Sequence, residues 1–278
     1  MYFLLLTFLL SCKSPETSLS LPAPVVVTSP TSVSTIPITR KLVWADEFDK
    51  DGLPDSTKWG YDVGGNGWGN NELQFYTRRR PENARIENGK LIIEARKEAY
   101  QDKNYTSARL LTQQKGTWTY GRMEAMAKLP KGVGTWPAVW MLGKNIPKVG
   151  WPRCGEIDIM EHVGFDEGVV HGTVHTESYN HAKKTEKGNA ITVKDVTLGF
   201  HLYAIEWTAD RIDFFVDDQK YYTVEKSALG NAEAQWPFDQ PFFLILNVAV
   251  GGNWGGKKGV DDTIWPQRME VDYVRVYQ

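Results

Sequence analysis

Short runs of strand-forming residues, separated by turn residues, fill the chain from Lys41 to its end. The runs at 201–207 and 212–216 alternate apolar and polar residues, and the short segment between them predicts a β-hairpin. The run at 242–250 is almost continuously apolar, which indicates a strand buried on both faces. No segment has the pattern of an amphipathic helix of three turns, and residues 225–230 allow a single turn. We expect further strands at 89–95, 108–113, 121–127, 138–142, 169–175 and 269–277.

Many short strands joined by turns predict an all-β sandwich or barrel. Residues 40–278 contain no internal repeat, and a segment of about 240 residues suffices for one large domain with a full core. We therefore expect a single β-sandwich domain over 40–278. The spatial order of its strands does not follow from these patterns alone.

Residues 156–161, Glu-Ile-Asp-Ile-Met-Glu, bring three carboxylates into one short stretch. In a regular strand Glu156 and Asp158 share one face, and Glu161 points to the other. A one-residue bulge at Ile159 and Met160 would return Glu161 to the face of the first two. Three neighbouring carboxylates repel one another, so we expect at least one raised pKa. Such a row costs stability, which favours a catalytic site over an ordinary half-solvated edge strand.

Tryptophans surround this acidic stretch. Trp136, Trp140 and Trp151 lie just upstream of it, and the whole chain contains 11 Trp. Aromatic rings beside paired carboxylates are typical of carbohydrate hydrolysis, because flat rings can pack against sugar faces.

Residues 134–141, Gly-Thr-Trp-Pro-Ala-Val-Trp-Met, followed by the acidic stretch 156–161, resemble the signature of glycoside hydrolase family 16. The resemblance is to its laminarinase-type endo-β-1,3-glucanases and runs from about Val43 to Gln278. The form with the additional Met is the bulged one, and lichenase relatives have one residue fewer between the carboxylates. The resemblance implies a concanavalin A-like β-jelly roll, a sandwich of two curved antiparallel sheets with a concave substrate cleft.

The resemblance also implies retaining hydrolysis of β-1,3-glucosidic bonds within laminarin-like chains. In that reaction Glu156 is the nucleophile, Glu161 is the general acid and then the general base, and Asp158 orients Glu156. Their surroundings must separate the pKa values, since one glutamate must be ionised while the other is protonated. Retaining enzymes hold the two carboxyl groups roughly 5 Å apart, whereas four strand steps span on the order of 13 Å. The sequence leaves this tension open.

Four tryptophans are candidates for stacking on glucosyl rings. Trp136 and Trp140 lie within the family signature, while Trp151 and Trp254 are supported only by their positions near the acidic stretch and in a Gly-rich loop. The alternative for Trp136 and Trp140 is a place in the hydrophobic core.

Three polar residues are further candidates for sugar binding. Arg109 is flanked by apolar residues and is expected to face the cleft, where it would donate to sugar hydroxyls or to Glu156. Asn70 and His175 resemble family positions that contact the sugar. A surface arginine and a core histidine remain the alternatives.

The resemblance implies a structural calcium site formed by Glu47, the carbonyl of Gly89 and Asp272, and oxygen ligands suit this cation. No cofactor is expected for catalysis. The five histidines show no transition-metal spacing.

The first ten residues are almost wholly apolar and too short to span a bilayer, which is typical of a secretory signal. Leu9 to Cys12 resemble a bacterial lipobox, so we expect residues 1–12 to be a signal peptide and Cys12 to be lipidated. A plain signal peptide with a stray cysteine is the alternative. Residues 13–39, rich in Ser, Thr and Pro, predict an extended tether. The chain would then be secreted across the inner membrane and anchored in the bacterial envelope, at the outer membrane or cell surface. We expect Cys154 to have no catalytic role.

The expected partner is a β-glucan polysaccharide. A net charge of −2 argues against nucleic acid, membrane contact is expected only through the lipid, and the chain is expected to be a monomer. A same-family hydrolase of mixed-linkage glucan, agarose, carrageenan or xyloglucan stays open, because residues 78–80 are all Arg and sulfated polymers favour a basic cleft. A non-catalytic glucan-binding lectin predicts a broken carboxylate row, whereas this row is intact.

Overall fold

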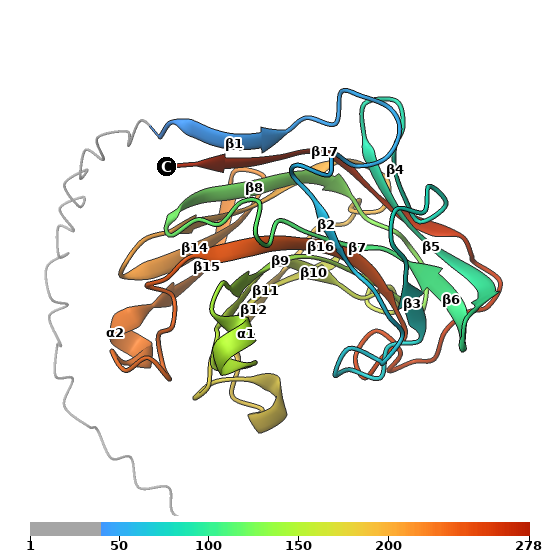
Figure 1. Ribbon diagram of the computed structural model, residues 1–278. Helices are drawn as coiled ribbons and strands as arrows, with labels where there is room; N and C mark the ends of the chain where they lie inside the picture. The colour runs from blue at the N-terminus through green and yellow to red at the C-terminus, as the bar shows by residue number, and fades with distance from the viewer. Residues whose placement is uncertain (1–39) are drawn as a thin grey trace, which may run out of the picture. The chain divides into compact units, whose positions relative to one another are not determined.

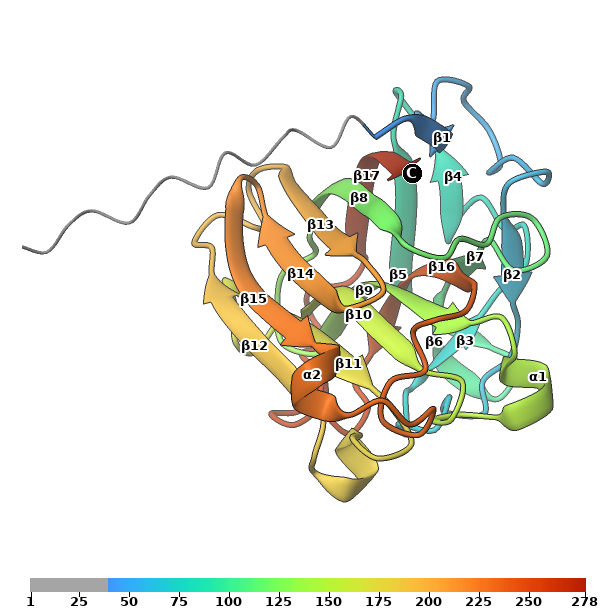
Figure 2. The same ribbon diagram turned by 90° about the vertical axis from the view of Figure 1, so that its left-hand side faces the viewer.

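The computed structural model describes residues 40–278. The predicted signal segment 1–12 with Cys12 and the tether 13–39 lie outside the described residues. Two curved sheets are stacked on each other in the described part, as Figure 1 shows from the side and Figure 2 after a quarter turn. None of the helices within 40–278 has the length and apolar character needed to cross a bilayer.

The outer sheet has ten strands. Its spatial order is β15 (Gln219–Glu225), β14 (Arg211–Val216), β13 (His201–Trp207), β8 (Gly121–Lys128), β17 (Gln267–Tyr277), β5 (Leu91–Tyr100), β6 (Lys103–Ser107) and β3 (Gln74–Tyr76), with β1 (Leu42–Asp46) beside β17 and β4 (Ala84–Ile86) beside β5.

The inner sheet has seven strands. Their order is β12 (Lys187–Thr192), β11 (Val169–His175), β10 (Glu156–His162), β9 (Thr135–Gly143), β16 (Phe242–Val250), β7 (Arg109–Leu111) and β2 (Gly60–Asp62). Three single helical turns complete the described elements: α1 (Ile146–Val149), η1 (His181–Lys183) and α2 (Lys226–Leu229).

The chain passes from sheet to sheet, since β7 and β9 belong to the inner sheet and β8 between them belongs to the outer sheet. This two-sheet arrangement confirms the predicted jelly roll. One detail differs: the short strands β3 and β6 pair in parallel, whereas the other named pairs within 40–278 are antiparallel.

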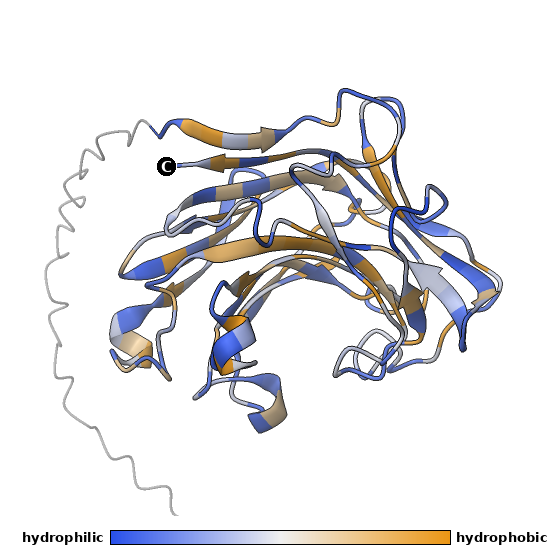
Figure 3. Cartoon of the chain, viewed as in Figure 1, coloured by the Kyte–Doolittle hydropathy of each residue, from blue (hydrophilic) through white to orange (hydrophobic). Residues whose placement is uncertain are grey.

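The main hydrophobic core lies between the two sheets. Strand β16 contributes Phe242, Leu244, Leu246, Val248 and Val250 to this core, and every residue of the strand is buried. Figure 3 shows its ribbon in hydrophobic colours over most of its length. The intervening side chains point to the other face of the inner sheet, which confirms a strand buried on both faces.

Strand bounds follow the apolar runs closely. Those of β11, β13 and β16 coincide with the predicted segments, and β13 pairs with β14 as the predicted hairpin. The run 108–113 forms a shorter strand, β7, because Thr112 begins a turn: its hydroxyl donates to the carbonyl of Gly116 at 2.8 Å.

Candidate active site

A bulge interrupts β10 in the middle of the acidic stretch. On the side of β9, Asp158 pairs with Trp140 and Met160 with Val139, so one residue of β10 is extra. On the side of β11, the register shifts between Asp158 and Glu161 in the same way. The predicted bulge at Ile159 and Met160 is confirmed.

The bulge separates the side chains of β10 into two sets. Ile157, Ile159 and Met160 are almost completely buried in the main core. Glu156, Asp158 and Glu161 line a cleft of about 830 Å³ on the other face of the inner sheet. Two consecutive core residues at the bulge allow the third carboxylate to face the same way as the first two.

Hydrogen-bond donors from two tryptophans hold the ends of the carboxylate row. The Trp151 indole N–H donates to Oε2 of Glu156 at 2.8 Å. The Trp136 indole N–H donates to Oε1 of Glu161 at 3.0 Å. Each glutamate therefore keeps one oxygen free of an indole, which leaves room for a reacting group.

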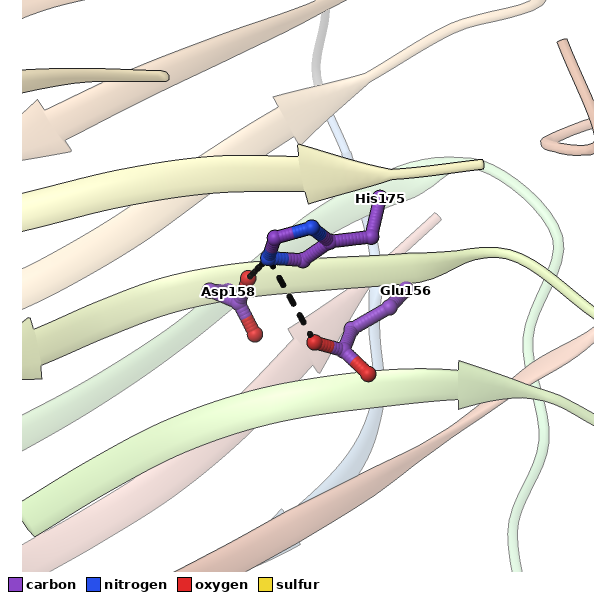
Figure 4. Close-up of side chains that lie close together, drawn as sticks. All are labelled: Glu156, Asp158 and His175. Carbon is purple, nitrogen blue, oxygen red and sulfur yellow. Dashed lines mark ion pairs between the residues drawn. The ribbon is translucent and has the colours of Figure 1, made fainter. Parts of the chain in front are cut away.

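His175 of β11 lies over the first two carboxylates. Its Nε2 is 3.3 Å from Oδ2 of Asp158 and 3.7 Å from Oε1 of Glu156. Figure 4 marks both ion pairs with dashed lines. The side chain is buried but borders the cleft. The alternative of a core histidine away from the site is thereby excluded.

All three carboxyl groups have raised pKa values. Burial is the main cause in each case, and it raises the pKa of Glu156, Asp158 and Glu161 to about 8. The charge of Asp158 adds to the shift of both glutamates. The repulsion expected within the row is therefore present, and desolvation exceeds it. Trp151 and His175 act against the shift of Glu156, but its pKa stays as high as that of Glu161, so these surroundings do not give the expected separation of the two pKa values.

A buried hydrogen-bond network lies behind Trp140. The indole N–H of Trp140 donates to Oδ1 of Asn247 at 2.7 Å. The amide of Asn247 donates to the Tyr76 hydroxyl at 3.1 Å, and this hydroxyl donates to Glu72 at 3.2 Å. Gln74 donates to the same carboxylate oxygen at 2.6 Å. The network fixes the plane of a tryptophan that borders the cleft.

Arg109 lies between two aromatic rings at the edge of the cleft. Its guanidinium carbon is 4.6 Å from the ring centroid of Trp140 and 4.8 Å from that of Trp68. Its ion-pair partner within the described residues is Asp62, with Nε 3.0 Å from Oδ2. The predicted cleft position is confirmed, whereas the alternative contact with Glu156 is replaced by the pair with Asp62.

Trp254 lies against Trp136 in an edge-to-face arrangement, with ring centroids 5.6 Å apart. It also contacts His171, whose ring centroid is 4.9 Å away. These rings extend the aromatic lining from Glu161 towards the loop that follows β16.

The seven residues predicted to bind substrate all line the cleft: Asn70, Arg109, Trp136, Trp140, Trp151, His175 and Trp254. The sequence reasoning missed further lining residues, namely Trp68, Glu72, His171, His181 and Asn247. The sequence could have indicated Asn247, because it is the polar residue within the apolar run 242–250.

The residues proposed for calcium do not form an open ligand set. Both carboxylate oxygens of Glu47 accept hydrogen bonds from Arg275, at 2.8 Å each. A guanidinium at this position opposes a cation, so Glu47 does not fit the site as it stands. Gly89 lies in the turn before β5, with φ of 70°, and Asp272 lies in β17. The calcium site stays a prediction.

Cys154 precedes β10 and is fully buried. Burial raises the pKa of its thiol to about 12, so it stays protonated at neutral pH. This agrees with the absence of a catalytic role predicted for it.

Comparison with known proteins agrees with this geometry. The family profile "Glycosyl hydrolases family 16" matches residues 71–275. A beta-glucanase from Rhodothermus marinus is 58% identical over 243 residues, which cover 86% of this chain and 85% of that protein. The X-ray structure of the laminarinase from Rhodothermus marinus is 57% identical and superposes with a TM-score of 0.84, covering 86% of this chain and 97% of that chain.

A second solved structure, SCLam, is described as a non-specific endo-beta-1,3(4)-glucanase from family GH16. It is 50% identical, with a TM-score of 0.83 over 88% of this chain and 93% of that chain. The family profile covers most of the domain, and these relatives match it at high identity. The chain therefore belongs to glycosyl hydrolase family 16.

Proposed function

We propose that the protein hydrolyses internal β-1,3-glucosidic bonds of laminarin-like β-glucans with retention of anomeric configuration. The observation that carries this proposal is the bulge of β10, which turns Glu161 into the same cleft as Glu156. The relatives named laminarinase and beta-glucanase support the substrate class.

In the first step, an oxygen of Glu156 attacks the anomeric carbon and forms a covalent glycosyl-enzyme. The indole of Trp151 holds Oε2 of Glu156 at 2.8 Å, which orients the carboxylate. Glu161 gives its proton to the departing glycosidic oxygen, and its raised pKa keeps that proton available near neutral pH.

In the second step, Glu161 is ionised and takes a proton from the water that attacks the glycosyl-enzyme. The indole of Trp136 donates to one of its oxygens at 3.0 Å, so the other oxygen carries the proton. Asp158 acts as a positioning residue, since it lies beside Glu156 and shares His175 with it.

The aromatic lining of the cleft supports binding of a sugar chain over several rings. Trp136, Trp140, Trp151 and Trp254 border it, and we assign them to stacking on glucosyl faces. Asn70, Arg109 and His175 supply polar groups for sugar hydroxyls. Crystals of an SCLam mutant hold a 1,3-beta-D-cellobiosyl-glucose at the active site, so mixed-linkage glucan is the second candidate substrate.

A panel of laminarin, lichenan, agarose and carrageenan, scored by newly formed reducing ends, tests the substrate. We expect the highest rate on laminarin and a lower rate on lichenan. Proton NMR of the first products tests the stereochemistry, and β-configured products are expected. Initial release of α-configured products, or a preference for a sulfated polymer, would contradict the proposal.

A further inference from the structure

The site contains a cluster of possible metal ligands that the proposed hydrolysis does not use as such. Glu156, Asp158 and His175 each offer a donor atom, and the three atoms lie within 4.8 Å of one another. Within residues 40–278 no other group of three or more His, Cys, Asp or Glu side chains meets this condition. Figure 4 shows the three side chains pointing towards one another.

Two of the donor atoms, both carboxylate oxygens, face the third, Nε2 of His175. Oδ2 of Asp158 is buried and accepts no hydrogen bond, although the residue is only 2% exposed. Oε1 of Glu156 faces His175, because the Trp151 indole holds the other oxygen. Buried carboxylate oxygens are normally satisfied, so the free Oδ2 indicates a place for a ligand.

The two distances from Nε2 of His175 are close to those around a small tetrahedral ion. Zinc binds imidazole nitrogen and carboxylate oxygen at about 2.0–2.2 Å, which places two ligands of a tetrahedron about 3.3–3.6 Å apart. Nε2 of His175 lies 3.3 Å from Oδ2 of Asp158 and 3.7 Å from Oε1 of Glu156. Calcium is less suited, because it takes six to eight oxygen ligands at longer distances.

We propose that Glu156, Asp158 and His175 bind one zinc ion, with water at the position that opens into the cleft, and that this ion reversibly blocks the site. A zinc-bound Glu156 has lost the oxygen needed to attack sugar. Zinc and the polysaccharide therefore compete for the same atoms. The blocking half of this inference rests on the proposed function, whereas the binding half does not.

Isothermal titration calorimetry of the full chain with zinc chloride measures binding directly. We expect one tight site per chain. Glu156→Gln and Asp158→Asn keep the side-chain shape but replace a carboxylate by an amide, and His175→Gln removes the imidazole. Each variant should weaken zinc binding by about tenfold or more, and circular dichroism verifies that each one is folded.

His201→Gln is the matched control. His201 also lies between two aspartates, but they approach opposite ring nitrogens: Asp195 is 3.3 Å from Nε2 and Asp217 is 2.9 Å from Nδ1. These donors cannot converge on one ion, so zinc binding should be unchanged in this variant. Loss of the site in His201→Gln, or its survival in folded Glu156→Gln and His175→Gln, overturns the proposal.

Steady-state kinetics then test the blocking role. Zinc should raise the KM for laminarin without lowering kcat, and a chelator should restore the original KM. A chain that binds zinc at this site but never cleaves laminarin contradicts the proposed function and leaves the metal site standing. A chain that cleaves laminarin but shows no calorimetric zinc site overturns the metal site alone.

Discussion

Trp140 of β9 donates its indole N–H to the side chain of Asn247 on β16, with 2.7 Å between nitrogen and oxygen. The two residues are diagonal neighbours, because Asn247 pairs with Ala138 and Trp140 with Ile245. The bond fixes the orientation of the Trp140 ring, which borders the cleft. The guanidinium of Arg109 lies over this ring. The ring that we assign to sugar stacking is thus oriented by a buried amide.

Asn247→Ala should free the indole ring of Trp140 from its fixed orientation. The substitution removes the acceptor for Trp140, and we expect kcat/KM on laminarin to fall about tenfold, mainly through a higher KM. Tyr76→Phe is the control, since it removes the next hydroxyl of the network but leaves the bond between Trp140 and Asn247 intact. Both variants should lose about 1–3 kcal/mol of unfolding free energy. An equal KM effect in the two variants would argue against a role for the indole orientation.

Glu156→Ser should abolish hydrolysis while the fold and sugar binding survive. The shorter serine side chain cannot reach the anomeric carbon and attack it as the carboxylate does. We therefore expect kcat to fall by at least about 10³-fold. Glu233→Ser, a change at an exposed residue, serves as the control for the mutation itself. Binding of laminarin oligosaccharides is followed by calorimetry. Activity close to that of the unchanged protein would remove the nucleophile assignment.

Asp158→Asn should make stability less dependent on pH. Burial raises the pKa of Asp158 to about 8 in the folded state, so the folded protein holds this proton more tightly than the unfolded chain. Stability is therefore lost as pH rises from the unfolded pKa, about 4, to about 8. The amide removes this loss, so we expect the variant to have a higher Tm than the unchanged protein near pH 8. The difference in Tm should be smaller near pH 5. Turnover should drop strongly in the variant.

Asp213→Asn provides the opposite case. Hydrogen bonds from Thr223 and Arg211 lower the pKa of this buried carboxyl despite its desolvation. Its stabilising contribution is present above the unfolded pKa and is lost as pH falls, so the amide should lower Tm at neutral pH. Thermal melts of Asp158→Asn and Asp213→Asn across this pH range test both expected changes in Tm, an increase for the first variant and a decrease for the second. A change in Tm of the same sign in both variants would contradict the pKa directions assigned to the two carboxyl groups.

Gly172→Ala should destabilise the contact between β11 and the outer sheet. A Cβ at this position would collide with the hydroxyl of Tyr221 and the ring of Phe214. We expect a loss of about 1–3 kcal/mol of unfolding free energy. Tyr221→Phe alone should cost little, because that hydroxyl is buried without a partner. In the double variant, removal of the hydroxyl should recover part of the loss, and denaturant unfolding of all four proteins measures the recovery.

Local patterns were sufficient to predict strands such as β13 and β16. The period of two in β13 and the apolar run of β16 are direct consequences of burial on one face or on both. The bulge followed from the position of Glu161, because an odd step along a strand reverses the face of a side chain. The exposed edge strand β12, Lys187–Thr192, gave no such signal, since neither of its faces is fully buried.

The support of the cleft could not be predicted in the same way. Tyr76 and Asn247 are 171 residues apart in the chain, and their bond depends on how the sheets are stacked. Glu72 is buried at the cleft although it follows a Gly- and Asn-rich loop. His181 reaches the site only because η1 folds back and stacks its ring on Trp151, with centroids 4.8 Å apart. Contacts of this kind depend on topology rather than on local periodicity.

The bulge of β10 also determines which length changes the enzyme can tolerate. Ile159 and Met160 both face the core, so a chain lacking one of them would still present its last glutamate to the sugar. Loss of a residue between Glu156 and Asp158 would instead send every later side chain to the wrong layer. Deletion of one residue is therefore compatible with the carboxylate row at Ile159 or Met160 and incompatible with it at Ile157.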